Sequence, residues 1–241
     1  KDVPHVHVPD VFDAFSTNRL LTMSWLDGDK LTDIIDKPSL KDRNAIAVNM
    51  FRTWYTPFYF YGVIHGDPHL GNYTVCKYNS INLLDYGCIR IFKPDFVQGV
   101  ITLYRALRDK KPELAVEAYK AWGFVNPSKQ LIDVLNIWAE FIYAPLLEDK
   151  TRLIEETNTG LYGRETANRV HQELRKIGKL EVPREFLFMD RGAVGLGSVF
   201  LRLRAEINWY RMFNDFIEDF DPKILARNQA KVLKAAGLAA N

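Results

Sequence analysis

The sequence predicts an α+β protein that is predominantly α-helical, with a few short strands in its N-terminal third. Before Gly28 and again from Val63 to Leu84, apolar residues alternate or form short runs between turn-forming residues, which is typical of strands. Beyond Phe92, they recur at three- and four-residue intervals in nearly every window, which is typical of helices. A chain of 241 residues, 47% of them hydrophobic, can bury a substantial core, so we expect one large domain or slightly more.

Strands are expected at the N-terminal end. His5-Val6-His7-Val8 alternates, and a second apolar run from Arg19 to Trp25 ends at Asp27-Gly28. Two lone strands bury little surface, so we expect a further strand-bearing part of the domain before Lys1. His5 and His7 could form a metal pair, but no third ligand stands in register, and a solvent-facing strand edge is the favoured interpretation.

A helix is expected between Gly28 and Gly62. Gly62 is placed to stop it, and Pro57 is predicted to kink it or end it early. The aromatic residues of this helix could belong to the core or to a lipid pocket, and we favour the core. The apolar residues that recur at helical spacing are Ile46, Met50, Phe51, Trp54, Tyr55 and Phe58, with Tyr59 beside them.

A hairpin and a helical body follow. Apolar segments at Tyr73–Cys76 and 81–84 flank Lys77-Tyr78-Asn79-Ser80, which has the composition of a turn. Glycines at 192, 195 and 197 either break the helix that contains them or mark close packing. Helices are predicted at 95–108, 112–122, 128–147, 164–177, 184–209 and 222–236.

Charge and cysteine content narrow the function classes. The net charge of +2 gives no reason to expect a nucleic-acid partner. The two cysteines, Cys76 and Cys88, fit neither a disulfide framework nor a zinc site and suit a reducing compartment, so a cytoplasmic location is expected. No apolar run is long enough to span a membrane. Basic helical stretches at 201–204 and 223–234 could contact an anionic membrane surface peripherally or simply be solvated.

The chemistry is expected at the two ends of the hairpin. Asp67 and Asn72 lie five residues apart just before it, and Asp85 follows it. Carboxylate and amide oxygens can hold magnesium, whose coordination a substrate phosphate can complete. The alternative is that these residues only form turns, which Asp and Asn favour anyway. Their order and spacing favour a phosphate-transfer site.

Three motifs resemble the UbiB/AarF family of atypical kinases. The first is His65-Gly66-Asp67-Pro68-His69-Leu70-Gly71-Asn72, which is similar to the family's catalytic loop, with Leu70 where proline is usual. The second is Asp85-Tyr86-Gly87, which resembles the Asp-Phe-Gly metal motif. The third is the run from Arg19 to Gly28, which is similar to the kinase strand and hinge. A weaker likeness spans Pro183 to Arg204.

The resemblance implies a protein-kinase-like C-terminal lobe at residues 29–241, and a residual N-lobe edge and hinge at residues 1–28. It implies ATP and Mg²⁺ as cofactors, Asp67 as the base or orienting carboxylate, and Asn72 and Asp85 as metal ligands. His69 stands where many kinases place a phosphate-contacting lysine, and His65 is expected to hold the loop. The hinge residues Met23, Ser24, Trp25 and Leu26 would contact the adenine, through backbone groups of Ser24 and Leu26.

The implied function is ATP-dependent phosphotransfer or ATP hydrolysis linked to ubiquinone biosynthesis and isoprenoid lipid handling, with a lipid or quinone-pathway component as partner. The family's nucleotide-gripping lysine and glycine-rich loop are expected upstream of residue 1, so we expect this chain alone to be inactive. Two alternatives stay open. A small-molecule phosphotransferase of the aminoglycoside or choline kinase type also uses His-Gly-Asp followed by Asn, but Asp85-Tyr86-Gly87 favours the first interpretation. The other alternative is a non-catalytic nucleotide-binding protein.

Overall fold

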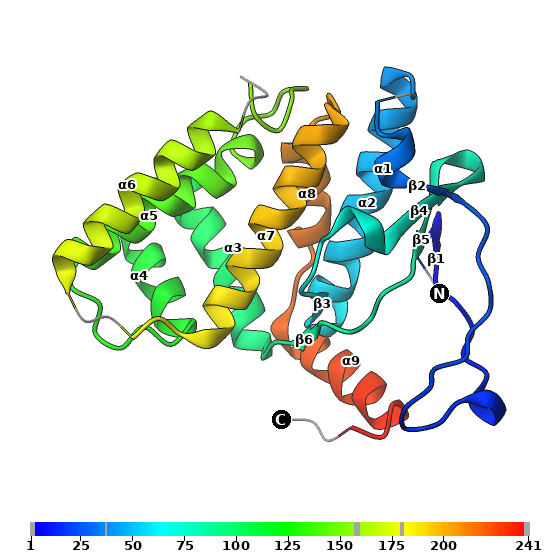
Figure 1. The fold of residues 1–241 in the computed structure, drawn as a ribbon. Helices are drawn as coiled ribbons and strands as arrows, with labels where there is room; N and C mark the ends of the chain where they lie inside the picture. The colour runs from blue at the N-terminus through cyan, green and yellow to red at the C-terminus, as the bar shows by residue number, and fades with distance from the viewer. Residues whose placement is uncertain (1–2, 37, 157–159, 179–180, 239–241) are drawn as a thin grey trace.

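The structure is a computed structural model that describes residues 3–36, 38–156, 160–178 and 181–238, and it is mainly helical with small sheets at one side (Figure 1). The predicted fold class is confirmed. The strands are β1 (Val6–His7), β2 (Asp29–Lys30), β3 (Val63–His65), β4 (Tyr73–Cys76), β5 (Ser80–Leu83) and β6 (Ile89–Ile91). The helices are α1 (Leu31–Ile34), α2 (Leu40–Tyr61), α3 (Pro94–Arg108), α4 (Pro112–Ala121), α5 (Lys129–Tyr143), α6 (Leu161–Ile177), α7 (Arg184–Leu203), α8 (Trp209–Ile217) and α9 (Pro222–Ala235).

The larger sheet has the order β1-β5-β4-β2, with the predicted hairpin β4–β5 at its centre. Strand β1 pairs parallel to β5, which confirms the strand expected at the N-terminal end, although Lys1 and Asp2 lie outside the described residues. The second predicted strand is wrong: within 19–25 only isolated bridges form, Thr17 with Leu20 and Val11 with Met23. The reason is that this segment loops away from the sheet and packs little (Figure 1). Apolar side chains in this segment and just before it stay exposed, 70% for Phe15 and 86% for Trp25.

Helix α2 is the central element that both sides of the molecule share. Two neighbouring stripes of its side chains, each at a spacing of four residues, are largely buried: Met50, Trp54 and Phe58 form one, and Phe51, Tyr55 and Tyr59 the other. The sequence predicts that Pro57 kinks the helix or ends it early; the helix does not end there, since α2 continues to Tyr61, and the kink stays a prediction. The buried residues on either side of Pro57 hold the last turns although one backbone hydrogen bond is lost.

The end of α2 forms as predicted at Gly62, which has the left-handed φ of 63° and donates its N–H to Phe58 O. A side chain there would collide with Gln229 and with Phe92 O. The amide nitrogen of Gln229, from α9, donates to Tyr61 O and Phe92 O at 2.9 and 2.8 Å. The C-terminal helix therefore closes the point at which the chain leaves α2 and enters β3.

The helical body confirms most of the predicted helices, with two differences. The segment predicted as one helix over 128–147 ends at Tyr143 and continues as a short 3-10 turn, Ala144–Leu146. The helix predicted over 184–209 splits, because Arg204 adopts a left-handed φ of 49° and Asn208 then caps α8 by accepting the Arg211 N–H. No helix in the described ranges is long and apolar enough to cross a membrane.

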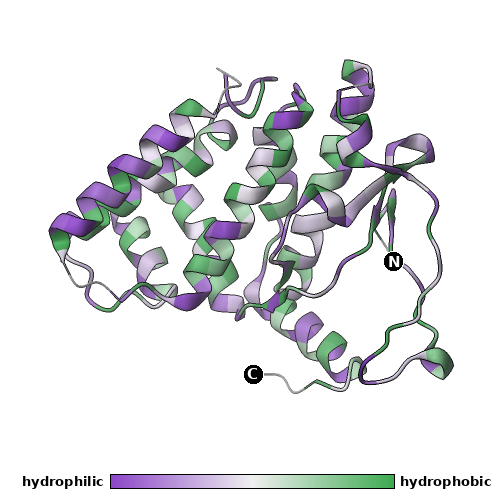
Figure 2. Cartoon of the chain, viewed as in Figure 1, coloured by the Kyte–Doolittle hydropathy of each residue, from purple (hydrophilic) through white to green (hydrophobic). Residues whose placement is uncertain are grey.

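One hydrophobic cluster joins α2 to the hairpin, α3, α4, α5, α7, α8 and α9. Helix α6 is different: it carries mostly hydrophilic residues (Figure 2), buries only Thr166 and packs on α5. The aromatic residues of α2 belong mainly to this cluster, as the sequence favoured. Tyr55 and Tyr59, however, also line a cavity, which is described below.

Candidate active site

The loop predicted to be catalytic begins from a two-stranded ladder. Strand β3 pairs antiparallel with β6, so that His65 lies opposite Ile89. Just beyond the ladder, Gly66 N–H donates to Cys88 O at 2.6 Å. A Cβ at Gly66 would lie 3.0 Å from both the oxygen and the sulfur of Cys88. The loop therefore starts at a point where the two chain segments touch and only glycine fits easily.

Short hydrogen bonds then shape the loop itself. The ring nitrogen Nδ1 of His65 accepts the Asp67 N–H at 3.1 Å, and the Asn72 side-chain amide donates to Asp67 O at 3.2 Å. His69 lies exposed and its Nδ1 accepts the Gly71 N–H at 3.1 Å. His65 is buried and holds the loop, as expected. The bond between Asn72 and Asp67 O uses the amide nitrogen of Asn72, and the amide oxygen of Asn72 takes no part in it.

The register of the hairpin brings Asp85 beside Asn72. Tyr73 pairs with Leu83, and one step further out Leu84 N–H donates to Asn72 O at 3.0 Å. Asp85 follows at once, and its Oδ1 accepts the Gly87 N–H at 2.7 Å, which fixes the carboxylate in a tight turn. Asn72 and Asp85 thus stand at the same open end of one hairpin, although 13 residues separate them in the chain.

Tyr86 stands where the Asp-Phe-Gly motif has phenylalanine, and its additional hydroxyl makes a hydrogen bond. Its hydroxyl donates to Leu83 O at 2.6 Å, a bond that a phenylalanine cannot make. Burial raises the pKa of Tyr86 to about 12, so the phenol stays protonated and can donate. The extra hydroxyl therefore fastens the turn that carries Asp85 back onto β5.

Tyr73 lies between the two carboxylates. Burial is the main cause that raises the pKa of its phenol, and the charges of Asp67 and Asp85 raise it further. Both carboxylates must therefore lie within electrostatic reach of one hydroxyl. That hydroxyl accepts a hydrogen bond from the indole nitrogen of Trp54 at 2.9 Å, and the Trp54 ring also packs edge-on against His65. Helix α2 thus supports the loop and the hairpin through one buried residue.

Helix α7 presses on the same loop from the far part of the chain. A Cβ at Gly195 would lie 2.2 Å from Cγ of Pro68, and one at Gly192 would contact the Trp54 ring at 3.7 Å. These glycines mark close packing, one of the two interpretations that the sequence allowed. Sequence analysis did not foresee Trp54, Tyr73 or Gly195 as parts of the site, and only the glycine cluster gave a signal for it.

The predicted hinge segment reaches the hairpin at its C-terminal end. The side-chain amide of buried Asn82 donates to Asp27 O at 3.0 Å, and Gly28 fits against Thr74 and Asn82. One backbone group of the predicted contact already has a partner: Ser24 N–H donates to Asp10 O at 2.8 Å. That N–H is therefore engaged, and an adenine ring would have to use other groups of the segment, such as the backbone at Leu26.

Magnesium suits the donors present. Asp67, Asp85 and Asn72 offer hard oxygen atoms, and magnesium takes few protein ligands when phosphates and water complete its octahedron. Within the described ranges, no three His, Cys, Asp or Glu side chains gather as a metal site. The fit is thus to a metal held jointly with a nucleotide, and not to a closed protein cage.

The two cysteines do not add a reactive group to this picture. Both are free and half-buried. The Cys76 sulfur donates to Ser80 O and Asn82 Oδ1 at 3.6 Å each, and burial raises the pKa of its thiol. Cys88 supports the loop through its backbone oxygen.

Comparison with known proteins finds a family match over the N-terminal part of the chain. Residues 1–118 match the ABC1 atypical kinase-like domain. The chain is similar to atypical kinase COQ8, mitochondrial, of Saccharomyces cerevisiae, with 32% identity over 114 residues, 46% of this chain and 23% of that protein. It is also similar to the Arabidopsis thaliana protein ACTIVITY OF BC1 COMPLEX KINASE 8, chloroplastic, with 26% identity over 138 residues, 56% of this chain and 18% of that protein. The matched part thus spans about a fifth of these relatives.

A second Arabidopsis thaliana relative is an uncharacterized aarF domain-containing protein kinase, chloroplastic, 23% identical over 128 residues, which cover 53% of this chain and 18% of that protein. The resemblance to the UbiB/AarF family is confirmed. Among solved structures, the chain is similar to Rv3197 of Mycobacterium tuberculosis, solved in complex with erythromycin. The alignment covers 93% of this chain and 54% of the Rv3197 chain, with a TM-score of 0.62 and 17% sequence identity. That likeness shows a shared fold.

Proposed function

We propose that the loop and hairpin of this chain bind magnesium and ATP for phosphoryl transfer or ATP hydrolysis, because residues 1–118 match the ABC1 atypical kinase-like domain. The observation that carries the proposal is the placement of Asp67, Asn72 and Asp85. Asn72 is hydrogen-bonded to the backbone of Asp67 and stands at the hairpin end that leads into Asp85. Both carboxylates act electrostatically on the Tyr73 phenol between them.

Each residue has a proposed role. Asn72 and Asp85 hold the magnesium ion, which neutralises the charge of the transferring phosphate. Asp67, at the end of the loop held by His65 and Gly66, orients or deprotonates the acceptor. His69 stands exposed two residues beyond it and contacts phosphate. Residues 1–28 supply the adenine-side segment Met23, Ser24, Trp25 and Leu26, and residues 29–241 supply the chemistry.

The phosphate acceptor and the cellular setting are further parts of the proposal. The resemblance supports a link to ubiquinone biosynthesis and isoprenoid lipids, with a lipid or quinone-pathway component as partner. The relatives named above are mitochondrial or chloroplastic. The two free cysteines support a reducing compartment, such as the cytoplasm or an organelle interior, and the basic stretches at 201–204 and 223–234 support a peripheral contact with a membrane surface.

The test separates the two carboxylates. Magnesium–ATP affinity and phosphate release are measured in a protein that joins this chain to the upstream lysine and glycine-rich loop expected from the resemblance. The variants are the parent, Asp85→Asn and Asp67→Asn, with Asp133→Asn, an exposed carboxylate on α5, as the charge-matched control. Asp85→Asn should weaken nucleotide binding and its magnesium dependence. Asp67→Asn should keep binding but lose roughly 10²–10⁴-fold in turnover, the usual contribution of a positioned base.

Two results would change the assignment. Unaltered turnover in Asp67→Asn, with binding intact, would favour a nucleotide-binding protein that moves no phosphate. Equal magnesium–ATP affinity for the parent, Asp85→Asn and Asp133→Asn would contradict the metal site itself.

A further inference from the structure

A largely apolar cavity lies on the other side of α2 from the candidate active site. It encloses about 620 Å³ between α2, α5, α6, α7 and α8. Cavities of roughly 300–1,000 Å³ lined mostly by apolar and aromatic side chains are those in which proteins hold small organic molecules. Its walls include Phe51, Ile142, Val194, Phe200, Leu201 and Phe213. Val194 is 41% exposed and Tyr162, at the α6 wall, is 54% exposed, so the cavity opens to solvent between α6 and α7.

The neutral polar group of interest in this wall is the Tyr59 hydroxyl. Tyr59 lines the cavity and is only 4% exposed, yet among the residues that the structure describes its hydroxyl has no hydrogen-bond partner. A buried hydroxyl left unpaired is costly, and most buried polar groups in proteins are paired. Burial raises the pKa of Tyr59 well above its ordinary value, so the group is a neutral phenol that can donate.

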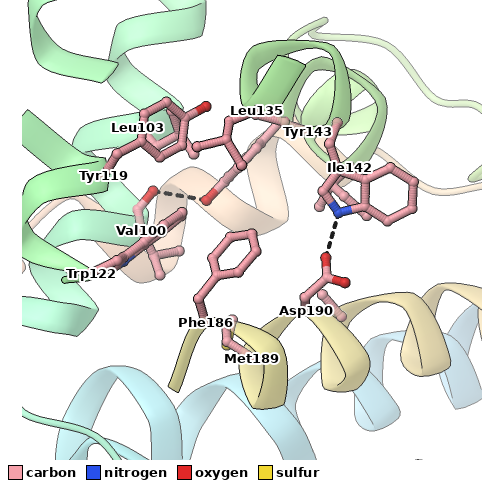
Figure 3. Close-up of a pocket in the computed structure, with 13 residues that line it drawn as sticks. Val100, Leu103, Tyr119, Trp122, Leu135, Ile142, Tyr143, Phe186, Met189 and Asp190 are labelled. Atoms are coloured by element: carbon pink, nitrogen blue, oxygen red, sulfur yellow. Dashed lines mark hydrogen bonds between the residues drawn. The ribbon is translucent and has the colours of Figure 1, made fainter. Parts of the chain in front are cut away.

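A neighbouring tyrosine supplies the contrast. Tyr143 lines the same cavity, but its hydroxyl donates to Val100 O at 2.9 Å, as the dashed line in Figure 3 shows. The two tyrosines influence each other electrostatically, so they lie close together. Of the tyrosines that line the cavity, Tyr143 thus has an engaged hydroxyl, and Tyr59 has a buried hydroxyl without a partner in the described part of the chain.

The charges near the cavity do not call for a charged occupant. Arg152, at the cavity wall, forms ion pairs with Glu148 and Glu156 at 3.3 and 3.1 Å. In the smaller cavity that adjoins the large one (Figure 3), the carboxylate of Asp190 accepts a hydrogen bond from the Trp138 indole. The charges of Arg152 and Asp190 thus have partners in the protein, and among the residues described the buried polar atoms of this wall without a partner are the Tyr59 hydroxyl and the Arg152 Nε.

We propose that this cavity binds a neutral, mostly apolar small molecule whose carbonyl oxygen accepts a hydrogen bond from Tyr59. The proposal is independent of the nucleotide site, since the groups that carry it lie on the Phe51, Tyr55 and Tyr59 stripe of α2 and not on the stripe that supports Tyr73. A large side chain introduced at Gly197 would fill the cavity, because Gly197 lines the wall and a Cβ built there has no atom within 4 Å.

The test uses Prodan, a neutral naphthalene dye with one carbonyl group whose emission reports both burial and hydrogen bonding. The full chain is titrated as the parent, as Tyr59→Phe, as Tyr143→Phe and as Gly197→Phe. Tyr59→Phe should bind about three- to tenfold more weakly, the usual effect of one hydrogen bond. Tyr143→Phe, which loses a hydroxyl already used by Val100, should bind as the parent does within about twofold, and Gly197→Phe should abolish binding because its ring fills the space.

Three results would overturn the proposal. The parent failing to bind Prodan would show that the cavity does not accept such a molecule. Equal affinity of Tyr59→Phe and the parent would show that the unpaired hydroxyl is no anchor. Full binding by Gly197→Phe would place the dye elsewhere. If Gly197→Phe does not fold, Val194→Trp, which starts from a partly exposed wall residue, replaces it with the same expected loss.

Discussion

Two buried tyrosines, Tyr73 and Tyr59, belong to the surroundings of two neighbouring stripes of helix α2, and their hydroxyls differ in what they contact. The hydroxyl of Tyr73 accepts the Trp54 indole hydrogen and lies within electrostatic reach of Asp67 and Asp85. The hydroxyl of Tyr59 has no partner in the described part of the chain, and Tyr59 lines a largely apolar cavity. Trp54 and Tyr55, which are neighbours in α2, thus contact different environments: Trp54 supports the candidate active site, and Tyr55 lines the cavity.

The two sides differ in how far the protein alone holds their polar groups. On the Tyr73 side, hydrogen bonds within the loop and hairpin hold the backbone of Asp67 and the carboxylate of Asp85 before any ligand binds, although the buried Nε2 of His65 has no partner among the described residues. On the Tyr59 side, the apolar walls leave space and an unpaired donor. We therefore expect changes on the Tyr73 side to cost stability and chemistry, and changes on the Tyr59 side to affect mainly binding in the cavity.

The largest effect is expected for Trp54→Ala. Trp54 is buried, packs on His65 and donates to Tyr73, so its loss should lower the free energy of unfolding by about 3–5 kcal/mol, as large aromatic truncations do. Tyr55→Ala, on the next stripe, should cost less because that side already borders empty space. Urea unfolding measures both. Equal losses would remove the distinction between the two sides of α2.

Paired substitutions in α7 should have opposite signs. Gly195→Ala would place a methyl group 2.2 Å from Pro68 and should destabilise the protein by about 1–3 kcal/mol while displacing the loop before Asn72. Gly197→Ala, two residues further along, meets open space and should stabilise by about 0.5–1 kcal/mol, since alanine favours helix over glycine. Thermal unfolding compares them. A stabilising Gly195→Ala would show that α7 does not hold the loop.

Removal of each tyrosine hydroxyl tests the comparison most simply. Tyr73→Phe leaves the Trp54 indole hydrogen buried without an acceptor and should cost about 1–3 kcal/mol. Tyr59→Phe removes a hydroxyl that had no partner and should leave stability unchanged or slightly higher. Chemical denaturation gives both values. A marked loss in Tyr59→Phe would mean that its hydroxyl is engaged after all.

A smaller, pH-dependent effect is expected at Asp190. Burial raises the pKa of its carboxyl, and the Trp138 hydrogen bond opposes this only in part. A raised folded-state pKa means that the stability contributed by the protonated form is present below the unfolded-state pKa near 3.9 and is lost as pH rises through the folded-state pKa. Asp190→Asn should therefore raise the melting temperature at pH 7, with the difference from the parent shrinking toward pH 4. A difference independent of pH would contradict burial of the charge.

Local sequence patterns predicted much of the fold and the composition of the candidate site. The left-handed stop at Gly62 and the turn between β4 and β5 depend on residues close together in the chain, and they were foreseen. The motif around Asp67, Asn72 and Asp85 was foreseen for the same reason. Their catalytic and metal-binding roles, and those of His69 and the segment Met23 to Leu26, stay predictions.

Features that depend on distant packing could not be foreseen. Pro57 remains inside a helix because buried neighbours hold it there. Gly195 contacts Pro68 across more than a hundred residues, and the cavity exists only once five helices have assembled. The split after Arg204 had a local signal in Asn208, a good helix cap, but the apolar periodicity on both sides of it masked that signal.

The central claim is that Asp67, Asn72 and Asp85 form one metal–nucleotide site, and paramagnetic NMR tests it most directly. Mn²⁺ in place of Mg²⁺ is added with ATP to the full chain, because the unpaired electrons broaden the amide signals nearest the metal even when binding is weak. The amides of Asn72, Asp85 and Gly87 should lose intensity first, those of Gly197 and Ala167 at the cavity should persist, and Asp85→Asn should abolish the selectivity. Broadening centred on any other part of the chain, or unchanged broadening in Asp85→Asn, would contradict the account.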